Sequence, residues 1–331
     1  MKKIKSLNGL RGIAALIVLI AHWWASNPDY GIYASGCGKI GVWCFMLLSG
    51  FFLMYPFANR ATLQFSISQY YLKKFLRIYP SYTLALVFAV VLGTLTWSDL
   101  YKHLLLYEGL GHFWYMPVII KMYIIGPIFV LTYEFLDKKF KDTMVVNSIY
   151  GIGFLIVGTA FAVIFPVYTY EENSISLYWY IPVFMIGMIL AMTYVSMQTK
   201  GINKCFAWDI ICIVSVIAIL VFTPFMRQAL WGVEPSGWLQ NKYLLMSGLW
   251  AFIILGLLFG KYIGELLEKC RFLQWIGNIS FPVYLLHYLF LGKLNMYITN
   301  IWVKGVLLII ITLSISWMVN EMFEKKIMGK L

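Results

Sequence analysis

The sequence is poor in charged residues, and acidic ones are scarcer than basic ones. Only 12% of the 331 residues are Asp, Glu, Lys or Arg, whereas soluble domains carry about 25%. Hydrophobic residues make up 61% of the chain, and the mean hydropathy is +0.79. A single soluble core could not hide so many apolar side chains, because a large part of any folded chain stays at the surface. The composition excludes a soluble enzyme and indicates an integral membrane protein.

Cysteine patterns that hold metals or form redox pairs are also missing. The five cysteines are scattered through apolar or loop positions, and no two of them form a CxxC pair. Zinc sites and thioredoxin-like sites need such close spacing. We therefore expect reduced cysteines that serve in packing and no bound metal.

Long polar segments are the third absence. No stretch between the apolar runs could fold as a soluble domain, and no internal repeat is visible. The first apolar run lacks a small-residue cleavage site, so we expect it to be kept as a helix. The sequence predicts one membrane domain over residues 1–331.

What the sequence does contain is a series of apolar runs of membrane-spanning length. A hydrocarbon core of about 30 Å requires about 20 mostly apolar residues in a helix. We predict an all-α bundle of about ten transmembrane helices. The predicted spans are 8–26, 40–57, 78–97, 113–135, 144–165, 176–196, 207–225, 243–263, 273–292 and 302–323.

The basic residues gather on one side of these spans. Nineteen of the 26 lysines and arginines lie in or beside the alternate connections that include both termini, and six lie on the other side. Cytoplasmic loops carry such an excess of Lys and Arg, which predicts that both termini are cytoplasmic. The formal charge of +12 therefore reflects membrane orientation, and we expect membrane lipids but no nucleic acid as partners.

Arg11 and His22 are the first ionisable residues that stand out in an apolar run. Eleven steps of about 100° return a helix to within about 20° of its start, so the two side chains share one face. His22 lies roughly 21 Å from the cytoplasmic end of its span at 1.5 Å per residue. Ionisable groups at such depth are costly and usually face a cavity. We expect a polar stripe on the first helix, with His22 as a candidate catalytic residue.

His287 and Lys121 fall in the same layer of the membrane. His287 enters from the cytoplasmic side to a depth similar to that of His22, and Lys121 lies about 12 Å down from the opposite side. Together with His22 they predict one polar cavity. Two alternatives stay open: a histidine can serve only as a hydrogen-bond partner between helices, and Lys121 can extend toward the outer surface. His103 and His112 are expected at the outer surface, in contact with solvent.

Lys74 and Arg77 stand at the cytoplasmic entrance of the third predicted span. Residues three apart are neighbours on a helix, so the two cations could clamp phosphates arriving from the cytoplasm. The alternative is that this cluster only anchors the topology, as basic residues beside a span often do.

Seven short sequence features follow one another along the chain. They are Leu10-Arg11-Gly12-Ile13-Ala14-Ala15 leading to His22, Leu48-Ser49-Gly50-Phe51, Lys74-Phe75-Leu76-Arg77-Ile78-Tyr79-Pro80, the set Trp114, Tyr123 and Pro127, Phe184-Met185-Ile186-Gly187, Ile276-Gly277-Asn278-Ile279-Ser280 with Tyr284-Leu285-Leu286-His287, and Glu324. In content and order they resemble the motifs of the membrane-bound acyltransferase 3 family, with lysine in the first basic place of the third motif. The resemblance covers nearly the whole chain.

This resemblance implies transfer of an acyl group, usually acetyl from cytoplasmic acetyl-CoA. The acceptor it implies is a hydroxyl of a carbohydrate or lipid-linked glycan, and the location is the bacterial cytoplasmic membrane. A second copy of the chain is a further candidate partner.

The resemblance also implies roles for individual residues. His22 is the expected base or transient acyl carrier, and Arg11 is expected to hold a donor phosphate or orient the donor arm. Lys74 and Arg77 are expected to bind the nucleotide phosphates of acetyl-CoA, and Ser49, Trp114 and Tyr123 to contact substrate. His287 or Lys121 would stabilise the oxyanion or position the acceptor, as acyl transfer requires.

The sequence departs from the family pattern in two places. Many members have a glutamate where this chain has Ile119, and Lys121 stands where an uncharged polar residue is more usual. The acid that would assist His22 is therefore missing from its usual position. Many members also carry a soluble hydrolase-like domain after the membrane part, and none follows here, so we expect transfer to be completed in the membrane domain or by a separate protein.

Two other classes of function remain open. A flippase or exporter of a lipid-linked saccharide could use the same polar layer as a permeation path, since transporters also bury charge between helices. A non-catalytic family member could use it to sense a ligand. Turnover of acetyl-CoA by the purified protein would distinguish the enzyme from both.

Overall fold

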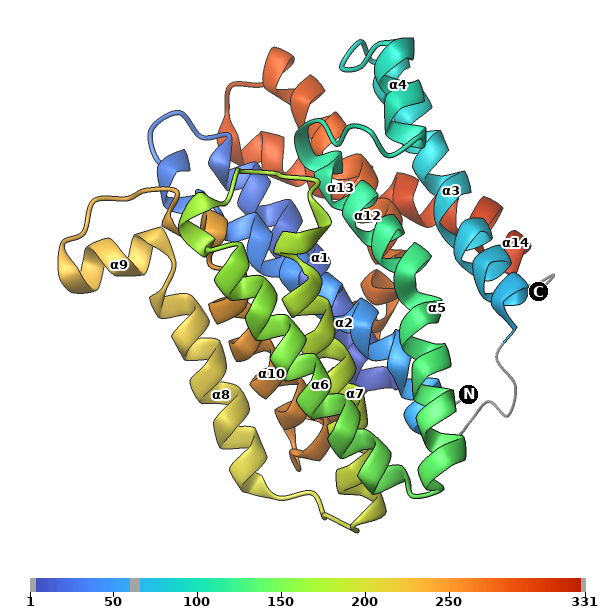
Figure 1. Ribbon diagram of the computed structural model, residues 1–331. Helices are drawn as coiled ribbons and strands as arrows, with labels where there is room; N and C mark the ends of the chain where they lie inside the picture. Colours follow the sequence, from blue (N-terminus) through green and yellow to red (C-terminus); the bar gives the residue numbers. More distant parts are fainter. Residues whose placement is uncertain (1–3, 60–65, 329–331) are drawn as a thin grey trace.

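The computed structural model describes residues 4–59 and 66–328, apart from the side chains of Glu324 and the two residues 327 and 328. Within these ranges the chain is helical and has no strand, which confirms the predicted all-α class (Figure 1). Glu324, the last of the seven sequence features, therefore cannot be compared with its expected position.

Ten helices of 16 or more residues form the bundle in the described ranges. Each coincides with one of the ten predicted spans, although several boundaries differ. They are α1 (Lys5–Ala25), α2 (Cys37–Ala58), α3 (Ile67–Val91), α5 (Tyr115–Phe140), α6 (Thr143–Ile164), α7 (Ile181–Thr199), α8 (Phe206–Val221), α10 (Tyr243–Phe259), α12 (Arg271–Tyr297) and α13 (Ile301–Val319).

Shorter elements connect these helices. Four are short α-helices, α4 (Trp97–Leu104), α9 (Pro224–Trp231), α11 (Ile263–Lys269) and α14 (Lys325–Met328). Five are 3₁₀ turns and one, η6, is a π turn: η1 (Gly31–Ala34), η2 (Gly111–Trp114), η3 (Val167–Thr169), η4 (Leu177–Trp179), η5 (Trp238–Asn241) and η6 (Asn320–Glu324).

Length and hydropathy single out most of the long helices as membrane spans. Seven described helical segments pass this test, and two more pass as pairs bent by 82° (α8 with α9) and 79° (α10 with α11). The tenth, α12, is long enough at 27 residues but is not among them. It carries the polar residues Gln274, Asn278, Ser280 and His287, of which Ser280 and His287 are fully buried.

Helix α3 begins eleven residues before the predicted start of its span at 78. Ser66 caps it, because the Ser66 hydroxyl accepts a hydrogen bond from the backbone N–H of Gln69, as N-cap serines do. Its first turns are exposed and polar, so hydropathy alone placed the start too late. This extension carries Lys74 and Arg77 on a rigid helix.

The outer surfaces of the peripheral helices are apolar, as contact with lipid requires. Only 22% of the apolar window of α6 and 33% of that of α13 is buried within the protein. The exposed side chains include Ile152, Ile156, Val163, Val214, Ile217, Leu220, Val306 and Ile310. The protein is therefore a multi-pass membrane protein whose peripheral helices face the hydrocarbon core.

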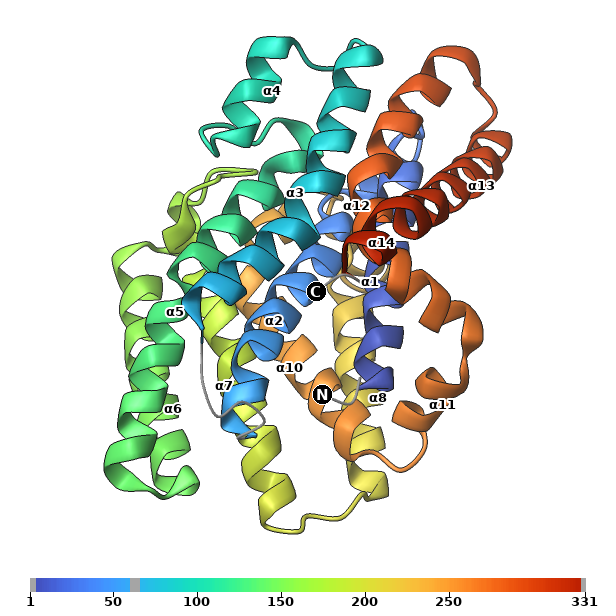
Figure 2. The same cartoon turned by 90° about the vertical axis from the view of Figure 1, so that its right-hand side faces the viewer.

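Helix α2 is central and packs against α1, α5, α7 and α10. The turns that join α5 to α6 and α7 to α8 lie at one end of the bundle, and α4 and the turn from α12 to α13 lie at the other. We name these the inner end, predicted to be cytoplasmic, and the outer end. Helix α3 crosses the bundle beside α12 (Figure 2).

Glycines allow α1 and α12 to touch backbone to backbone. A Cβ on Gly277 would lie 2.1 Å from the carbonyl oxygen of Asn8, and one on Gly12 would lie 2.5 Å from that of Leu273. The Asn8 amide also donates to the Gln274 carbonyl at 3.0 Å. Small residues permit such close approach of helices in membranes, and this contact fixes the register of the two helices that carry His22 and His287.

A second glycine contact joins α2 to α7. A Cβ on Gly50 would lie 2.2 Å from the carbonyl oxygen of Phe184, and one on Gly187 would lie 2.0 Å from that of Leu47. Two of the short sequence motifs, Leu48 to Phe51 and Phe184 to Gly187, therefore meet each other at one helix crossing. Their shared role is to place Ser49 on a rigid surface.

Replacing Gly277 by Leu should separate α1 from α12. The new side chain cannot fit beside the Asn8 carbonyl, and forced overpacking typically costs about 1–3 kcal/mol, sometimes more. We expect a clear fall in the melting temperature of the purified protein in detergent, measured by scanning fluorimetry. Gly248→Leu in α10 is the matched control, because a Cβ there meets no atom within 4 Å. Equal melting temperatures for the two variants would contradict this role of Gly277.

Candidate functional site

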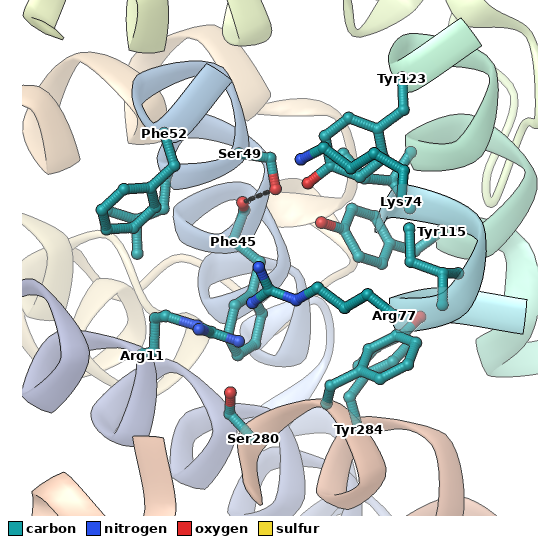
Figure 3. A pocket seen from close by; sticks show the side chains of 14 residues that line it. Arg11, Phe45, Ser49, Phe52, Lys74, Arg77, Tyr115, Tyr123, Ser280 and Tyr284 are labelled. Carbon is teal, nitrogen blue, oxygen red and sulfur yellow. Dashed lines mark hydrogen bonds between the residues drawn. The ribbon is translucent and has the colours of Figure 1, made fainter. Parts of the chain in front are cut away.

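A cavity at the inner half of the bundle collects most of the basic residues that the sequence singled out. Residues from α1, α2, α3, α5 and α12 line it, and its volume is about 100 Å³. The lining residues are Arg11, Phe45, Leu48, Ser49, Phe52, Lys74, Arg77, Ile78, Tyr115, Ile119, Tyr123, Ser280, Phe281 and Tyr284. We call it the inner cavity (Figure 3).

Three cations face this cavity, and none of its lining residues in the described ranges is acidic. Figure 3 shows the guanidinium groups of Arg11 and Arg77 directed toward each other from α1 and α3. Arg77 is exposed and Lys74 half-buried, so the cavity opens beside Arg77. Such a cluster attracts an anion, because guanidinium and ammonium groups bind phosphate and carboxylate by charge-assisted hydrogen bonds.

Lys74 is held by an aromatic neighbour on α5. Its Nζ lies 3.7 Å from the centre of the Tyr123 ring, within the range of a cation–π contact. Both residues line the inner cavity. The sequence prediction that Lys74 and Arg77 act together is consistent with their common place in this wall.

A proline on α5 explains how α3 docks there. Pro127 has no N–H, so the carbonyl of Tyr123, four residues earlier, loses its helical partner. The Tyr70 hydroxyl donates to that carbonyl at 3.1 Å. A Cβ on Gly126 would lie 2.6 Å from the same hydroxyl oxygen, so the glycine leaves room for Tyr70. Gly126 and Pro127 thus fix the start of α3, one helical turn before Lys74.

Ser49 occupies the opposite wall of the inner cavity. Its hydroxyl donates to the Phe45 carbonyl at 2.8 Å, and Tyr115 and Tyr123 line the same cavity (Figure 3). Polar side chains therefore line the cavity from the cations to Ser49, in the middle of α2. Ser280, from the late motif on α12, lines the same cavity and donates to the Gly277 carbonyl at 2.9 Å.

His22 and His287 are direct partners. His22 Nδ1 lies 2.9 Å from His287 Nε2, and the two rings are stacked with centres 5.0 Å apart. The prediction that both histidines lie at one depth is confirmed. Helices α1 and α12 bring them together through the glycine contact described above.

The hydrogen bonds fix which nitrogen carries each proton. His287 Nδ1 lies 3.0 Å from the Val283 carbonyl, which can only accept, so Nδ1 carries the hydrogen. The Nε2 of a neutral His287 is then an acceptor, and it accepts the Nδ1–H of His22. His22 Nε2 is left with a free lone pair, which is the form that a general base needs.

That free nitrogen lies at a second, larger cavity toward the outer end. A Cβ on Gly38 would lie 3.3 Å from His22 Nε2, and both residues line this outer cavity of about 560 Å³. Its lining includes Ala21, His22, Ala25, Asn27, Pro28, Gly31, Ile32, Ala34, Ser35, Gly36, Gly38, Lys39, Val42, Gly111, His112, Trp114, Glu172, Asn173, Gln240, Tyr284 and Tyr288. It is large enough for a small-molecule ligand.

One residue, Tyr284, lines both cavities among the described residues. Its hydroxyl donates to the carbonyl of His112. Arg11 lines the inner cavity and His22 the outer one, so the polar stripe on α1 runs from one cavity to the other. The eleven helical steps from Arg11 to His22 rise about 16 Å.

Two histidines expected in solvent are buried instead. His112 is 8% exposed and His103 is fully buried. The η2 turn folds inward and places the His112 ring 5.5 Å from that of His287, while His103 pairs with the Tyr82 hydroxyl at 3.0 Å. The sequence prediction was wrong here because a polar residue beside a span need not lie in solvent once a turn folds back.

Lys121 is not brought to the histidines. It lines neither cavity, and its Nζ donates to the backbone carbonyl of Ile175, 3.3 Å away. The expectation that Lys121 faces the histidines is corrected. The segment between α6 and α7 folds over this face of α5 and supplies a carbonyl partner.

The remaining predicted residues divide between the cavities. Tyr123 and Ser49 line the inner one and Trp114 the outer one, so the three do not form one substrate surface. Ile119, where an acid was expected, forms part of the inner wall. In the described ranges the ring of His22 is therefore hydrogen-bonded to a second histidine, His287.

Lys39 is the site residue that the sequence interpretation missed. It had been counted among the lysines of the outer side, yet it lies in the first turn of α2, is 7% exposed and lines the outer cavity. The signal that could have revealed it is Gly36, which adopts a left-handed conformation at φ 77° and starts the helix just before Lys39. Glycine favours this conformation.

The histidines, cysteines and acids of the described residues contain no group of three placed to hold a metal ion. His287 Nδ1 and His112 Nε2 are each directed at a helix carbonyl, of Val283 and Leu285. These nitrogens serve to orient the rings.

Comparison with known proteins gave one match. The model of a family described as "Acyltransferase domain" matches residues 4–321, nearly the whole chain. No curated protein and no solved structure matches the chain.

Proposed function

The chain belongs to this acyltransferase 3 family, and we propose that it moves an acetyl group from cytoplasmic acetyl-CoA to a hydroxyl of a carbohydrate or lipid-linked glycan. The protein is a multi-pass membrane acyltransferase. We propose further that it lies in the bacterial cytoplasmic membrane and that His22 takes part in the transfer.

The observation that carries the proposal is the pairing of two cavities along α1. The inner cavity presents Arg11, Lys74 and Arg77, and the outer one presents His22, with Tyr284 between them. A donor rich in phosphate suits the first, and a hydroxyl that must lose a proton suits the second. A transporter would have no use for a histidine whose tautomer is set by a second histidine so that its Nε2 stays unprotonated.

The inner cavity supports a donor with a charged head and a slender arm. Three cations at the mouth would hold the nucleotide phosphates of acetyl-CoA, since such contacts are charge-assisted. The same cavity of about 100 Å³ is also lined by the apolar side chains of Leu48, Ile119 and Phe281. A flexible pantetheine arm would reach along this space toward Tyr284 and the histidines.

His22 would carry the proton. Its Nε2 takes the proton from the acceptor hydroxyl as the oxygen attacks the thioester carbonyl carbon, and the C–S bond then breaks. The imidazolium returns that proton to the departing CoA sulfur, so His22 ends as it began. His287 holds the ring in the required tautomer by accepting its Nδ1–H.

The test of this function uses the purified protein reconstituted into vesicles of one orientation. Release of CoA thiol is followed with acetyl-CoA supplied on the side of the inner cavity and a mixture of cell-surface glycans supplied on the other. We expect turnover that depends on both and on the side of addition. Absence of turnover together with movement of a lipid-linked saccharide across the bilayer would favour the transporter instead.

Arg77→Ala should weaken acetyl-CoA binding more than it slows the bound complex. The guanidinium would grip remote phosphates, and a hydrogen bond to a charged group is worth about 1.5–3 kcal/mol, which is roughly tenfold or more in affinity. We expect a raised KM for acetyl-CoA with kcat little changed. The effect should be smaller for acetyl-pantetheine, which lacks the nucleotide.

Lys73→Ala is the matched control for Arg77. Lys73 belongs to the same basic cluster but is exposed and does not line the inner cavity. If the cluster served only as a topology anchor, both variants would behave alike. Unchanged donor affinity in Arg77→Ala would return the cluster to that role.

A further inference from the structure

The outer cavity holds two polar groups to which the reaction above gives no role. Lys39 is 7% exposed, and the Oε1 of Gln240 is buried with no hydrogen-bond partner in the described part of the chain. Both residues line the cavity that His22 also lines. A buried acceptor without a donor is costly, so such groups usually await a ligand or water.

A directed chain of hydroxyls holds Lys39 in place. Tyr180 donates to the Ser174 carbonyl at 3.0 Å, so Tyr170 donates to the Tyr180 oxygen, 2.7 Å away. The Tyr170 oxygen is left to accept from Lys39 Nζ at 3.5 Å. This contact uses one of the three hydrogens of the ammonium group.

The rest of the Lys39 environment is aromatic. Its Nζ lies 5.5 Å from the centre of the Trp114 ring and 5.3 Å from that of Tyr170, where ring faces attract a cation. No acidic group within the described ranges forms a salt bridge with Lys39. Glu172 lies at the exposed rim of the same cavity.

An ammonium so deeply buried is expensive unless an anion and further hydrogen bonds compensate it. Within the cavity a negative group on a ligand could take the two remaining hydrogens. Gln240 Oε1 would accept a hydrogen bond from a neighbouring hydroxyl. Cation and hydroxyl acceptor together match a polyhydroxylated molecule that also carries a negative charge.

We propose that the outer cavity is the acceptor site and that Lys39 selects a carbohydrate bearing an anionic group, either a carboxylate or a phosphate. This inference rests on the proposed function in one respect, since the hydroxyl presented to His22 Nε2 is the one that receives the acyl group. Lys39 is then a specificity-determining residue, and Gln240 orients the sugar ring.

Binding of three soluble probes tests the inference without any donor. Methyl β-D-glucuronide and methyl β-D-glucoside differ only in the carboxylate, and glucose 1-phosphate carries phosphate instead. Titration calorimetry or saturation-transfer NMR on the purified protein gives the affinities. We expect the anionic probes to bind about tenfold more tightly than the glucoside, as one charge-assisted hydrogen bond would provide. The stronger of the two anionic probes identifies the carboxylate or the phosphate as the natural group.

Substitutions then assign the preference to Lys39. Lys39→Gln should make glucuronide and glucoside bind equally, and Lys39→Arg should keep the preference because it keeps the charge. Lys102→Gln is the matched control, since Lys102 pairs with Glu108 outside the cavity. If Lys39→Gln does not fold, Glu172→Gln at the exposed rim gives the answer, because loss of a competing negative charge should increase the preference for glucuronide.

Three results would overturn the inference: equal binding of the probes by the wild-type protein, a preserved preference in Lys39→Gln, or a reduced preference in Glu172→Gln. Each leaves the proposed function standing if the protein still turns over acetyl-CoA in vesicles. Conversely, selective binding of the anionic probes without acetyl-CoA turnover would support the site and count against the enzyme.

Discussion

His22→Ala is expected to lower acyl transfer by about 10²–10⁴-fold, the usual contribution of a general base. The reason is the free lone pair on Nε2, which faces the outer cavity while Nδ1 is held by His287. Folding and donor binding should persist, because the cations of the inner cavity are untouched. The measurement is single-turnover transfer from labelled acetyl-CoA, beside the melting temperature and the donor affinity of the same sample.

His22→Gln serves as the size-matched companion variant. It keeps a polar side chain at the same depth but has no basic nitrogen, so it should be as inactive as the alanine variant. Residual activity above a tenth of wild type in either variant would remove His22 from the catalytic role.

His287→Ala is expected to lower kcat by about 10–10²-fold, the range seen when a partner that orients a functional histidine is removed. In the described ranges His287 lines neither the inner nor the outer cavity. It acts through His22, so it is a positioning residue. Without Nε2 of His287 as acceptor, His22 can hold its proton on either nitrogen. The fraction of His22 in the productive tautomer then falls. The KM for acetyl-CoA should stay unchanged.

A merely structural role for His287 predicts a different pattern. His287→Gln offers an amide oxygen that can accept the Nδ1–H of His22, and we expect it to recover much of the lost rate. Nitrogen NMR of labelled histidine should show a mixed His22 tautomer in His287→Ala and a single one in the wild type. Equal loss of activity in both variants, with a single tautomer throughout, would contradict the positioning role.

The sequence predicted much of this arrangement, because helical periodicity and membrane thickness are local rules. Arg11 and His22 share a stripe on α1 that follows from their spacing of eleven residues. Depth counted along each span placed His287 level with His22, and the two rings are in contact. These inferences needed no knowledge of which helices are neighbours.

The depth of a residue in the membrane does not determine which way its side chain faces, and the sequence did not predict that direction. Lys121 donates to the backbone carbonyl of Ile175, in the connection between α6 and α7, and lines neither cavity. Trp114 and Tyr123 line different cavities. Which way a side chain faces depends on the rotation of a helix against its neighbours, and that rotation is set by the glycine contacts between helices distant in sequence.

Irregular segments were the second limit. Lys39 and His112 are buried because short turns, at Gly36 and at η2, fold inward over the ends of the helices. Hydropathy assigns such residues to the water phase, since it has no measure of a turn that covers a cavity. Ile119 stands where an acid was expected, and it lines the inner cavity. His22 lines the other cavity and is hydrogen-bonded to His287 on α12.

Tyr284 gives the arrangement a consequence for the cell's energy supply. If the donor enters from one side of the membrane and the acceptor from the other, the inner and outer cavities lie end to end across it. In the described structure a buried tyrosine, 3% exposed and tied to the His112 carbonyl, stands between them. A continuous column of water at this point would conduct protons and discharge the ion gradient on which transport and ATP synthesis depend. The aromatic ring therefore acts as an electrical insulator, and Tyr284→Gly should make vesicles containing the protein leak protons, as a pH-sensitive dye inside them would report.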